Sequence, residues 1–201
     1  MEILATETEQ LIKDTAKKVF FVDGNIHATT QDIADAAGIN RASIHYYYRS
    51  RKKLLDTVLQ EAMIEMQTKI QSISEQAITF REQTEKFIEF FLERSLQHPY
   101  LEMFIITELN ANPELAALAL NKEEREARVK DVTEGIEGEV KAGAMKPIHP
   151  AQFMITLISL CSFPFLGQTL LRHILSMDKE TYVKFIMERK NVIMKLIFLD
   201  A

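Results

Sequence analysis

The sequence predicts an all-α fold, and three observations lead to that prediction. Five prolines and six glycines in 201 residues leave few natural chain breaks, which favours long helices over many short strands. Apolar residues recur at helical spacing in successive segments, and no alternating pattern predicts strands. Apolar residues make up 47% of the chain, which is ample for a packed core.

The first two helices are predicted from their apolar spacing and their ends. A helix is expected over Thr6–Val22, followed by Gly24, which suits a left-handed C-cap. A second helix should begin at Thr29, because Thr29 and Asp32 have the spacing of a capping box, in which each side chain bonds the other's backbone N–H. Gly38 should end this helix.

Two further helices should follow closely. A short helix is expected from Asn40 or Arg41 to about Tyr48, and a long helix should start near Ser50. The long helix is predicted by one apolar stripe, which consists of Leu54, Leu55, Val58, Leu59, Ala62, Met63, Met66, Ile70 and Ile73.

The rest of the chain predicts five more helices, so we expect about nine in all. They should begin near Phe80, Tyr100, Asn112-Pro113, Pro150 and Asp178. The seventh should be solvated in its middle, because the segment 122–128 is nearly all charged. Pro164 should kink or interrupt the eighth. We expect two domains, residues 1–50 and residues 51–201.

The segment from Pro147 to Leu171 has no acidic, lysine or arginine side chain and is long enough to span a bilayer. It contains many polar residues and lacks strongly basic flanks, so we predict a helix buried on most sides instead. The single cysteine, Cys161, excludes an internal disulfide and suits a reducing compartment. The acidic N-terminus carries no export signal, and we therefore expect a cytoplasmic protein.

The segment from Thr29 to Lys53 is the most informative part of the chain. It has the order helix, glycine turn, short helix, then aromatic and basic residues. Between Asn40 and Lys53 there are five cations and no acid, although the whole chain has a net charge of −5. Small and polar residues at the start of the short helix would let it enter a DNA major groove. An acidic chain with one basic strip is typical of a site-specific DNA binder.

Residues 10 to 58 resemble the N-terminal domain of TetR-type (TetR/AcrR) transcriptional regulators. The shared features are Ala16 to Phe20, Gly24, Ala28-Thr29-Thr30, Asp32-Ile33-Ala34, Ala37-Gly38-Ile39 and the small, hydroxyl and aromatic residues that follow. The rest of the chain is similar, less specifically, to the helical ligand-binding and dimerisation region of this family. The resemblance implies a helix-turn-helix DNA-binding domain joined by a long helix to an effector-binding and dimerisation domain.

The resemblance and the chemistry of phosphate and base contacts assign ten residues to DNA binding, namely Thr29, Thr30, Asn40, Arg41, Ala42, Ser43, His45, Tyr46, Tyr47 and Arg51. His45 stands where the family often has tyrosine, and Arg49 where proline is common, so the operator sequence stays open. Within the tyrosine run we expect Tyr48 to be mostly core and Tyr46 to be exposed. The alternatives are core packing for the tyrosines and a solvated helix start for the basic strip.

The resemblance also implies a mechanism. A homodimer, paired through the eighth and ninth helices, would act as a repressor and leave a palindromic operator when a small, largely apolar molecule binds the body. Eight residues are candidate ligand contacts, and the alternative for them is simple core filling: Phe87, Phe91, Met103, Phe104, Thr107, Phe153, Leu157 and Cys161.

Two other classes of function are kept as alternatives. The first is a module that senses an apolar molecule and has a degenerate DNA-binding head. The second is an enzyme, for which the sequence offers no catalytic set, no phosphate-binding glycine loop and no histidines at metal-ligand spacing. We therefore predict no enzymatic activity, no cofactor and no metal.

Overall fold

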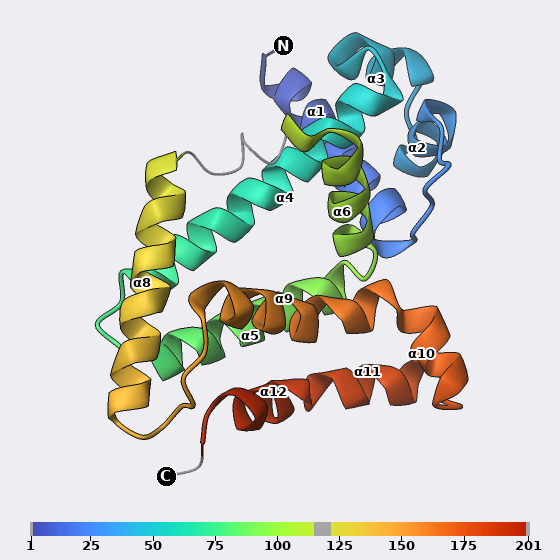
Figure 1. Cartoon of the computed structure of the whole chain (residues 1–201). Helices are drawn as coiled ribbons and strands as arrows, with labels where there is room; N and C mark the ends of the chain where they lie inside the picture. The colour runs from blue at the N-terminus through green and yellow to red at the C-terminus, as the bar shows by residue number, and fades with distance from the viewer. Residues whose placement is uncertain (1, 115–121, 200–201) are drawn as a thin grey trace.

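The computed structural model describes residues 2–114 and 122–199, and every regular element in these ranges is helical, as predicted. The N-terminal part contains α1 (Glu2–Lys17), the π-helix η1 (Lys18–Val22), α2 (Thr30–Ala37), α3 (Arg41–Tyr48) and the long α4 (Arg51–Ser74). The remainder contains α5 (Phe80–Gln97), α6 (Leu101–Ala111), α8 (Lys122–Lys141), α9 (Pro150–Leu166), α10 (Gln168–Ile174), α11 (Lys179–Met187) and α12 (Arg189–Ile197). Figure 1 shows α1 to α3 gathered at one end of α4, with α6 between this head and the helices below.

The described ranges contain eleven α-helices, because two of the nine predicted helices divide. The eighth breaks at Gly167, where α9 and α10 meet with a bend of 77°. The ninth breaks at Glu188, which separates α11 from α12. The predicted seventh helix falls partly on residues 115–121, which lie outside the described residues, and its later part forms α8 with an exposed, charged start.

The interruption predicted at Pro164 occurs three residues later, and the contacts around the proline explain this. Proline has no N–H to donate to the carbonyl of Leu160, and Arg189 Nε donates to that oxygen instead at 2.8 Å. Tyr182 Oη donates to the carbonyl of Pro164, also at 2.8 Å. Helix α9 therefore continues through the proline, with α11 and α12 bonded to it, and ends at Gly167.

The head has its own core, to which two residues of α6 belong. The buried side chains of α1, η1, α2, α3 and the first half of α4 pack in one cluster, and Leu101 and Phe104 of α6 complete it. The predicted capping box at Thr29 and the helix end at Gly38 are present, and Gly24 has the expected positive φ directly after Asp23, the C-cap of η1. Helix α4 begins after Ser50, whose side chain caps it. The predicted division at residue 50 stays a prediction, although this cluster extends across it into α4.

The π-helix η1 explains how two adjacent phenylalanines are both buried. The N–H of Asp23 bonds to the carbonyl of Lys18, five residues back, which widens the last turn of the helix. Phe20 and Phe21 then both face α6, and the centroid of each ring lies 5.7 Å from that of Phe104. The end of the first helix is thus packed directly against a helix of the body.

A second core lies between α5, α8, α9, α11 and α12. Helix α9 buries only one face in it, through residues such as Phe153, Leu157 and Cys161, while Ile155 and Phe163 are exposed. The prediction of a helix buried on most sides is therefore wrong for the single chain, because no element within residues 2–114 and 122–199 covers this outer face. Among the described residues no single helix has the length and apolar content to cross a bilayer; the bent pair α9–α10 meets both criteria only when taken together.

An ion-pair cluster joins α1 to α4, and it gives a pH-dependent prediction. Glu61 accepts from Lys13 Nζ at 2.7 Å and lies 2.8 Å from Lys17 Nζ. Burial alone would raise the pKa of Glu61, but the two lysines outweigh it, and the pKa is lowered. Glu61→Gln should therefore reduce the free energy of unfolding at pH 7 by about 1 kcal/mol.

The difference between wild type and Glu61→Gln should disappear in acid. Because the folded pKa is the lower one, the stabilisation is present above the ordinary value of 4.5 and is lost as the pH falls through the folded value. Urea unfolding at pH 7 and at pH 3 measures the difference in the free energy of unfolding between wild type and Glu61→Gln. Glu65→Gln, on the exposed side of α4, is the matched control. A difference that persists at pH 3 would contradict the electrostatic explanation.

Candidate nucleic-acid interface

The start of α3 is exposed and carries small side chains. Asn40 is the N-cap, and its side-chain oxygen accepts from the backbone N–H of Ala42 at 2.8 Å. This bond satisfies one of the free N–H groups of the first turn and fixes the direction in which the helix begins. Arg41 and Ala42 are exposed and Ser43 is half-buried, so the first turn presents little bulk toward an approaching surface.

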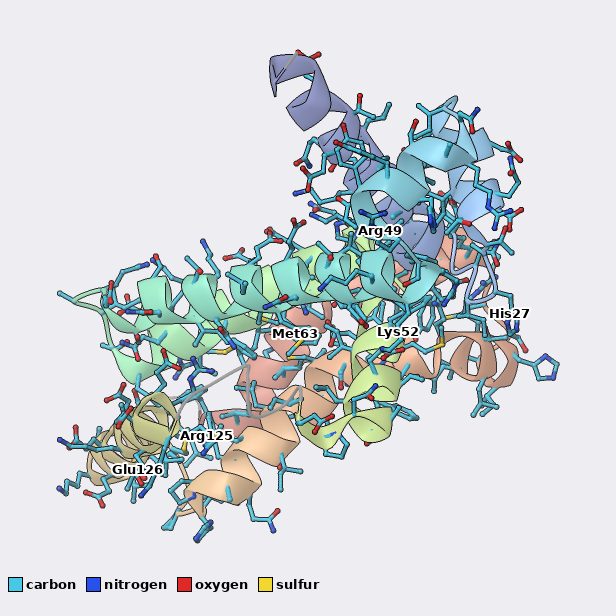
Figure 2. All side chains as sticks on the ribbon, turned by 90° about the horizontal axis from the view of Figure 1, so that it is seen from above. His27, Arg49, Lys52, Met63, Arg125 and Glu126 are labelled. Atoms are coloured by element: carbon cyan, nitrogen blue, oxygen red, sulfur yellow. The ribbon has the colours of Figure 1, made fainter. Side chains whose placement is uncertain are left out.

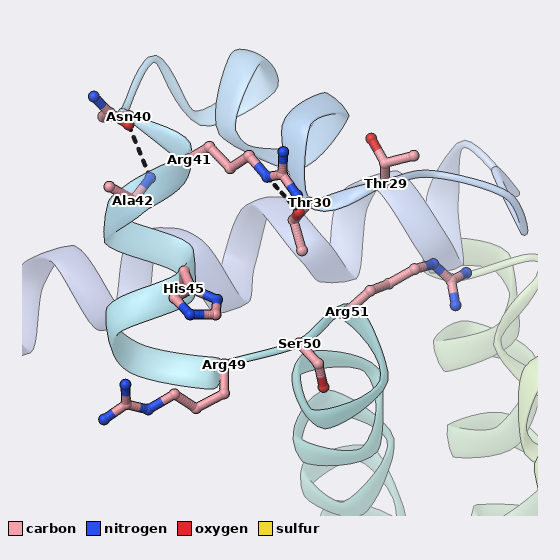
Figure 3. Close-up of a pocket in the computed structure, with 9 residues that line it drawn as sticks. All are labelled: Thr29, Thr30, Asn40, Arg41, Ala42, His45, Arg49, Ser50 and Arg51. Carbon is pink, nitrogen blue, oxygen red and sulfur yellow. Dashed lines mark hydrogen bonds between the residues drawn. The ribbon is translucent and has the colours of Figure 1, made fainter.

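Helix α2 is positioned by the predicted capping box. Asp32 N donates to Thr29 Oγ1 at 3.2 Å, and Thr29 N donates to Asp32 Oδ2 at 2.7 Å. These bonds lower the pKa of the Asp32 carboxyl. Arg41 Nε then reaches across from α3 and donates to Thr30 Oγ1 at 3.2 Å, as Figure 3 shows. The first turns of the two helices are therefore connected at the protein surface.

These turns border one shallow, open depression. Its lining consists of Thr29, Thr30, Asn40, Arg41, Ala42, His45, Arg49, Ser50 and Arg51. The lining contains three arginines and no acid, so it attracts an anion such as a phosphate. Seven of these nine residues are among the ten that the sequence assigned to DNA binding. In Figure 2, Arg49 and Lys52 lie at the head end of α4, far from Arg125 and Glu126 on α8.

The three tyrosines have different environments. Tyr46 is 71% exposed, as predicted, and its ring meets that of Tyr47 edge to face at 5.1 Å. Tyr47 is half-buried, and Tyr48 is buried in the head core, also as predicted. The phenol of Tyr46 is therefore accessible to a ligand, whereas Tyr48 holds α3 against the head core. Core packing, the alternative considered for the three tyrosines, describes Tyr48 but not Tyr46.

Arg51 lines the depression, as the sequence predicted, and its guanidinium also bonds within the chain. Its Nε and Nη2 donate to the carbonyls of Ala28 and Ile26, at 2.6 and 2.5 Å, and its guanidinium lies over the ring of Phe20. Figure 3 shows Arg49 and Arg51 extending in opposite directions, with Arg51 toward the segment before Thr29. The Nε and Nη2 groups of Arg51 are therefore engaged within the chain. Arg49, which the sequence analysis did not assign to the site, is exposed in the lining, as is Arg41.

Arg49 is also in a strained backbone conformation. It ends α3 with φ 62° and ψ −38°, and Ser50 N donates to the carbonyl of Tyr48 at 2.6 Å, which closes a tight γ-turn around Arg49. Left-handed φ values are unfavourable for residues with a Cβ. A sequence pattern does not reveal such a turn, because no glycine or asparagine marks it.

We expect Arg49→Gly to separate strain from charge. Glycine adopts positive φ readily, so the free energy of unfolding should rise by about 1 kcal/mol in denaturant titrations. DNA affinity should fall several-fold, because one cation is lost from the depression. Arg49→Ala is the control: it loses the same charge and keeps the strain. Equal stability of the glycine and alanine variants would show that the turn stores no strain.

The candidate ligand contacts of the body divide between the two cores. Phe91, Phe153, Leu157 and Cys161 share the second core, and Phe87 packs at its edge. The three candidates on α6 do not join them: Met103 and Phe104 pack with the head core, and Thr107 is exposed. Their role as ligand contacts stays a prediction.

The body contains the single cysteine of the chain, Cys161, which is buried. Burial raises the pKa of the Cys161 thiol to about 12, so this cysteine is a poor nucleophile. Among residues 2–114 and 122–199, no three His, Cys, Asp or Glu side chains are grouped to hold a metal ion.

Comparison with known proteins agrees with this geometry. The family described as "Bacterial regulatory proteins, tetR family" matches residues 12–58, which cover η1, α2, α3 and parts of α1 and α4. An uncharacterized HTH-type transcriptional regulator of Bacillus subtilis (strain 168), YhgD, is 25% identical over 162 residues, or 78% of this chain and 82% of that protein.

Solved structures show the same fold over nearly the whole chain. The ketosteroid transcriptional regulator KstR2 of Mycobacterium tuberculosis has a TM-score of 0.67 at 14% identity and covers 96% of both chains. The TetR-like regulator LfrR of Mycobacterium smegmatis, in complex with proflavine, has a TM-score of 0.59 at 21% identity and covers 92% of this chain and 94% of that one. Residues 12–58 therefore match the tetR family of bacterial regulatory proteins, and the chain as a whole has the fold of solved regulators of this type.

Proposed function

We propose that this protein is a ligand-responsive repressor that binds a palindromic operator as a homodimer and leaves it when a small molecule binds the body. The observation that carries the proposal is the acid-free depression at the start of α3, which offers arginines and hydroxyls beside an exposed, small-residue helix start. Helices of this kind insert their first turns into the major groove, while surrounding cations and hydroxyls contact phosphates.

The proposed dimer is supported by the outer face of α9 to α12. Its exposed apolar side chains are Ile155, Ile158, Phe163, Leu166, Leu170, Ile174, Leu175, Val183, Phe185, Met187, Val192 and Leu196. Monomeric proteins rarely expose a contiguous apolar surface of this size. A second copy of the chain would cover it with the same face, as twofold interfaces do. Two heads would then meet successive major grooves, about one helical turn apart or slightly more.

The proposed effector is small and largely apolar. The phenylalanines and aliphatic residues of the second core would surround such a molecule. The fold neighbour LfrR, solved with proflavine, is a protein of this architecture that binds a small organic molecule. For release to occur, the effector must prefer the conformation in which the two heads no longer match the operator. We place this function in the cytoplasm, where the operator is.

Fluorescence anisotropy tests the proposal. The purified protein is titrated onto the duplex upstream of its own gene and onto an unrelated duplex, at several salt concentrations. Preferential binding that weakens steeply with salt supports a specific regulator. Equal binding to both duplexes contradicts control of the adjacent gene. Compounds that raise the melting temperature are then added to the complex, and one that stabilises the protein without releasing DNA contradicts the release mechanism.

A further inference from the structure

We infer that the body controls the DNA-binding surface through α6 and η1, along a path in which Arg51, the first residue of α4, connects η1 to the segment before α2. The inference rests on the proposed function, since it concerns how an event in the body would alter the head. It assigns Arg51 a positioning role instead of the phosphate contact that the sequence suggested. Four sets of contacts make up the path.

The first set joins α6 to the body. Arg94 of α5 and Glu102 of α6 form a buried ion pair, in which Arg94 is 5% exposed and Glu102 is 8% exposed. Arg94 Nη1 also donates to the carbonyl of Ala62 on α4 at 3.3 Å. Separating a buried pair of charges leaves each without compensation, which is strongly unfavourable. Helix α6 should therefore move together with the end of α5, and not independently of it.

The second set joins α6 to η1. The N–H of Tyr100 donates to the carbonyl of Phe21 at 3.0 Å, and the ring of Phe104 packs on both phenylalanines of η1. The Tyr100 ring also covers Gly24, where a Cβ would lie 2.7 Å from the ring. Such close contact leaves no room for η1 to stay in place if α6 shifts, because packed side chains transmit displacement.

The third set joins η1 to the segment that precedes α2. The guanidinium of Arg51 lies 5.1 Å from the centroid of Phe20 and donates to the carbonyls of Ile26 and Ala28. Ala28 is buried and is followed directly by Thr29. Arg51 therefore connects the aromatic cluster to the residues that lead into the N-cap of α2.

The last set is the DNA-binding surface itself. Thr29 caps α2, and Thr30 accepts from Arg41 of α3. A shift of the segment 26–28 would change the position of both hydroxyls and of the arginine. A displacement along this path would therefore alter the arrangement of residues within the head.

Hydrogen exchange and a double-mutant cycle test the inference on the full-length dimer. Phe104→Leu alters the α6 side, and Arg51→Lys keeps the charge but loses the paired donors. Phe198→Leu, the same change in the second core at a residue that is not a candidate ligand contact, is the matched control. Phe104→Leu and Arg51→Lys should each speed exchange of the Ala28, Asp32 and Ile33 amides several-fold, and Phe198→Leu should not. Phe104→Met replaces Phe104→Leu if the leucine variant does not fold.

DNA affinity provides the second readout. Each of the two variants should weaken binding to the upstream duplex about 5- to 10-fold, and the double variant should be little weaker than either one alone. Losses of DNA affinity that multiply in the double variant, or an equal effect of Phe198→Leu on exchange of the Ala28 amide, would overturn the inference. The exchange measurement needs no DNA. A chain that shows coupled exchange but binds no duplex would therefore refute the proposed function and leave the coupling intact.

Discussion

Replacing Arg41 and Tyr46 with alanine should lower the affinity for specific DNA by at least about 100-fold, because each base or phosphate contact contributes about 1–3 kcal/mol. Both residues are exposed, so the fold and the melting temperature should change little. The loss should be visible in fluorescence anisotropy. The dependence of affinity on salt should also become shallower if Arg41 contacts a phosphate, because its positive charge is lost.

Two control variants make this result specific. Lys130→Ala removes an exposed cation of α8, on the far side from the head, and should leave DNA affinity unchanged. Thr30→Ala removes the hydroxyl that accepts from Arg41 and should show how much of the effect comes from fixing the arginine in place. An unchanged affinity in the double variant would favour the alternative of a sensing module whose head no longer binds DNA.

Placing a charge on the outer face of α11 or α12 should produce monomers. Phe185 is 57% exposed and Leu196 is 67% exposed, and burying a carboxylate at either position in an apolar interface is unfavourable. Phe185→Glu and Leu196→Glu should therefore sediment as monomers. Affinity for the operator should fall about 100-fold or more, because two linked heads bind far more tightly than one.

The matched control is Ile64→Glu, which changes an exposed isoleucine of α4 outside this face. It should remain a dimer with the wild-type DNA affinity. If Phe185→Glu and Leu196→Glu are still dimers at the same concentration, the dimer interface lies elsewhere, and the arrangement of the two heads proposed above is wrong.

Much of the head could be predicted because its signals are local. The capping box at Thr29 and Asp32 and the glycine at Gly38 act within a few residues, and both are present as expected. The exposure of Tyr46 and the burial of Tyr48 follow from helical periodicity once the ends of α3 are known. Helix ends that are set by such local signals can be predicted without knowing how the rest of the chain folds.

The features that the sequence did not reveal depend on contacts between distant segments. The π-helix at Phe20 and Phe21 is accompanied by the packing of Phe104, which is more than eighty residues away. Arg51 donates to carbonyl groups, and side-chain patterns carry no information on where carbonyls point. The packing of Met103 and Phe104 of α6 against the head could not be foreseen, since helical spacing shows that a face is apolar but not what covers it.

Selection from a random duplex library by the purified dimer, followed by sequencing, tests the central claim most directly. If two recognition helices act together on one DNA molecule, the enriched sequences should contain two inverted half-sites whose centres lie about 34 Å apart or slightly more along the helix. Separating these half-sites by a further half turn should abolish binding, because the heads would then face opposite sides of the DNA. A library that shows no enrichment, at low salt and with a folded dimer, would contradict sequence-specific binding by this head.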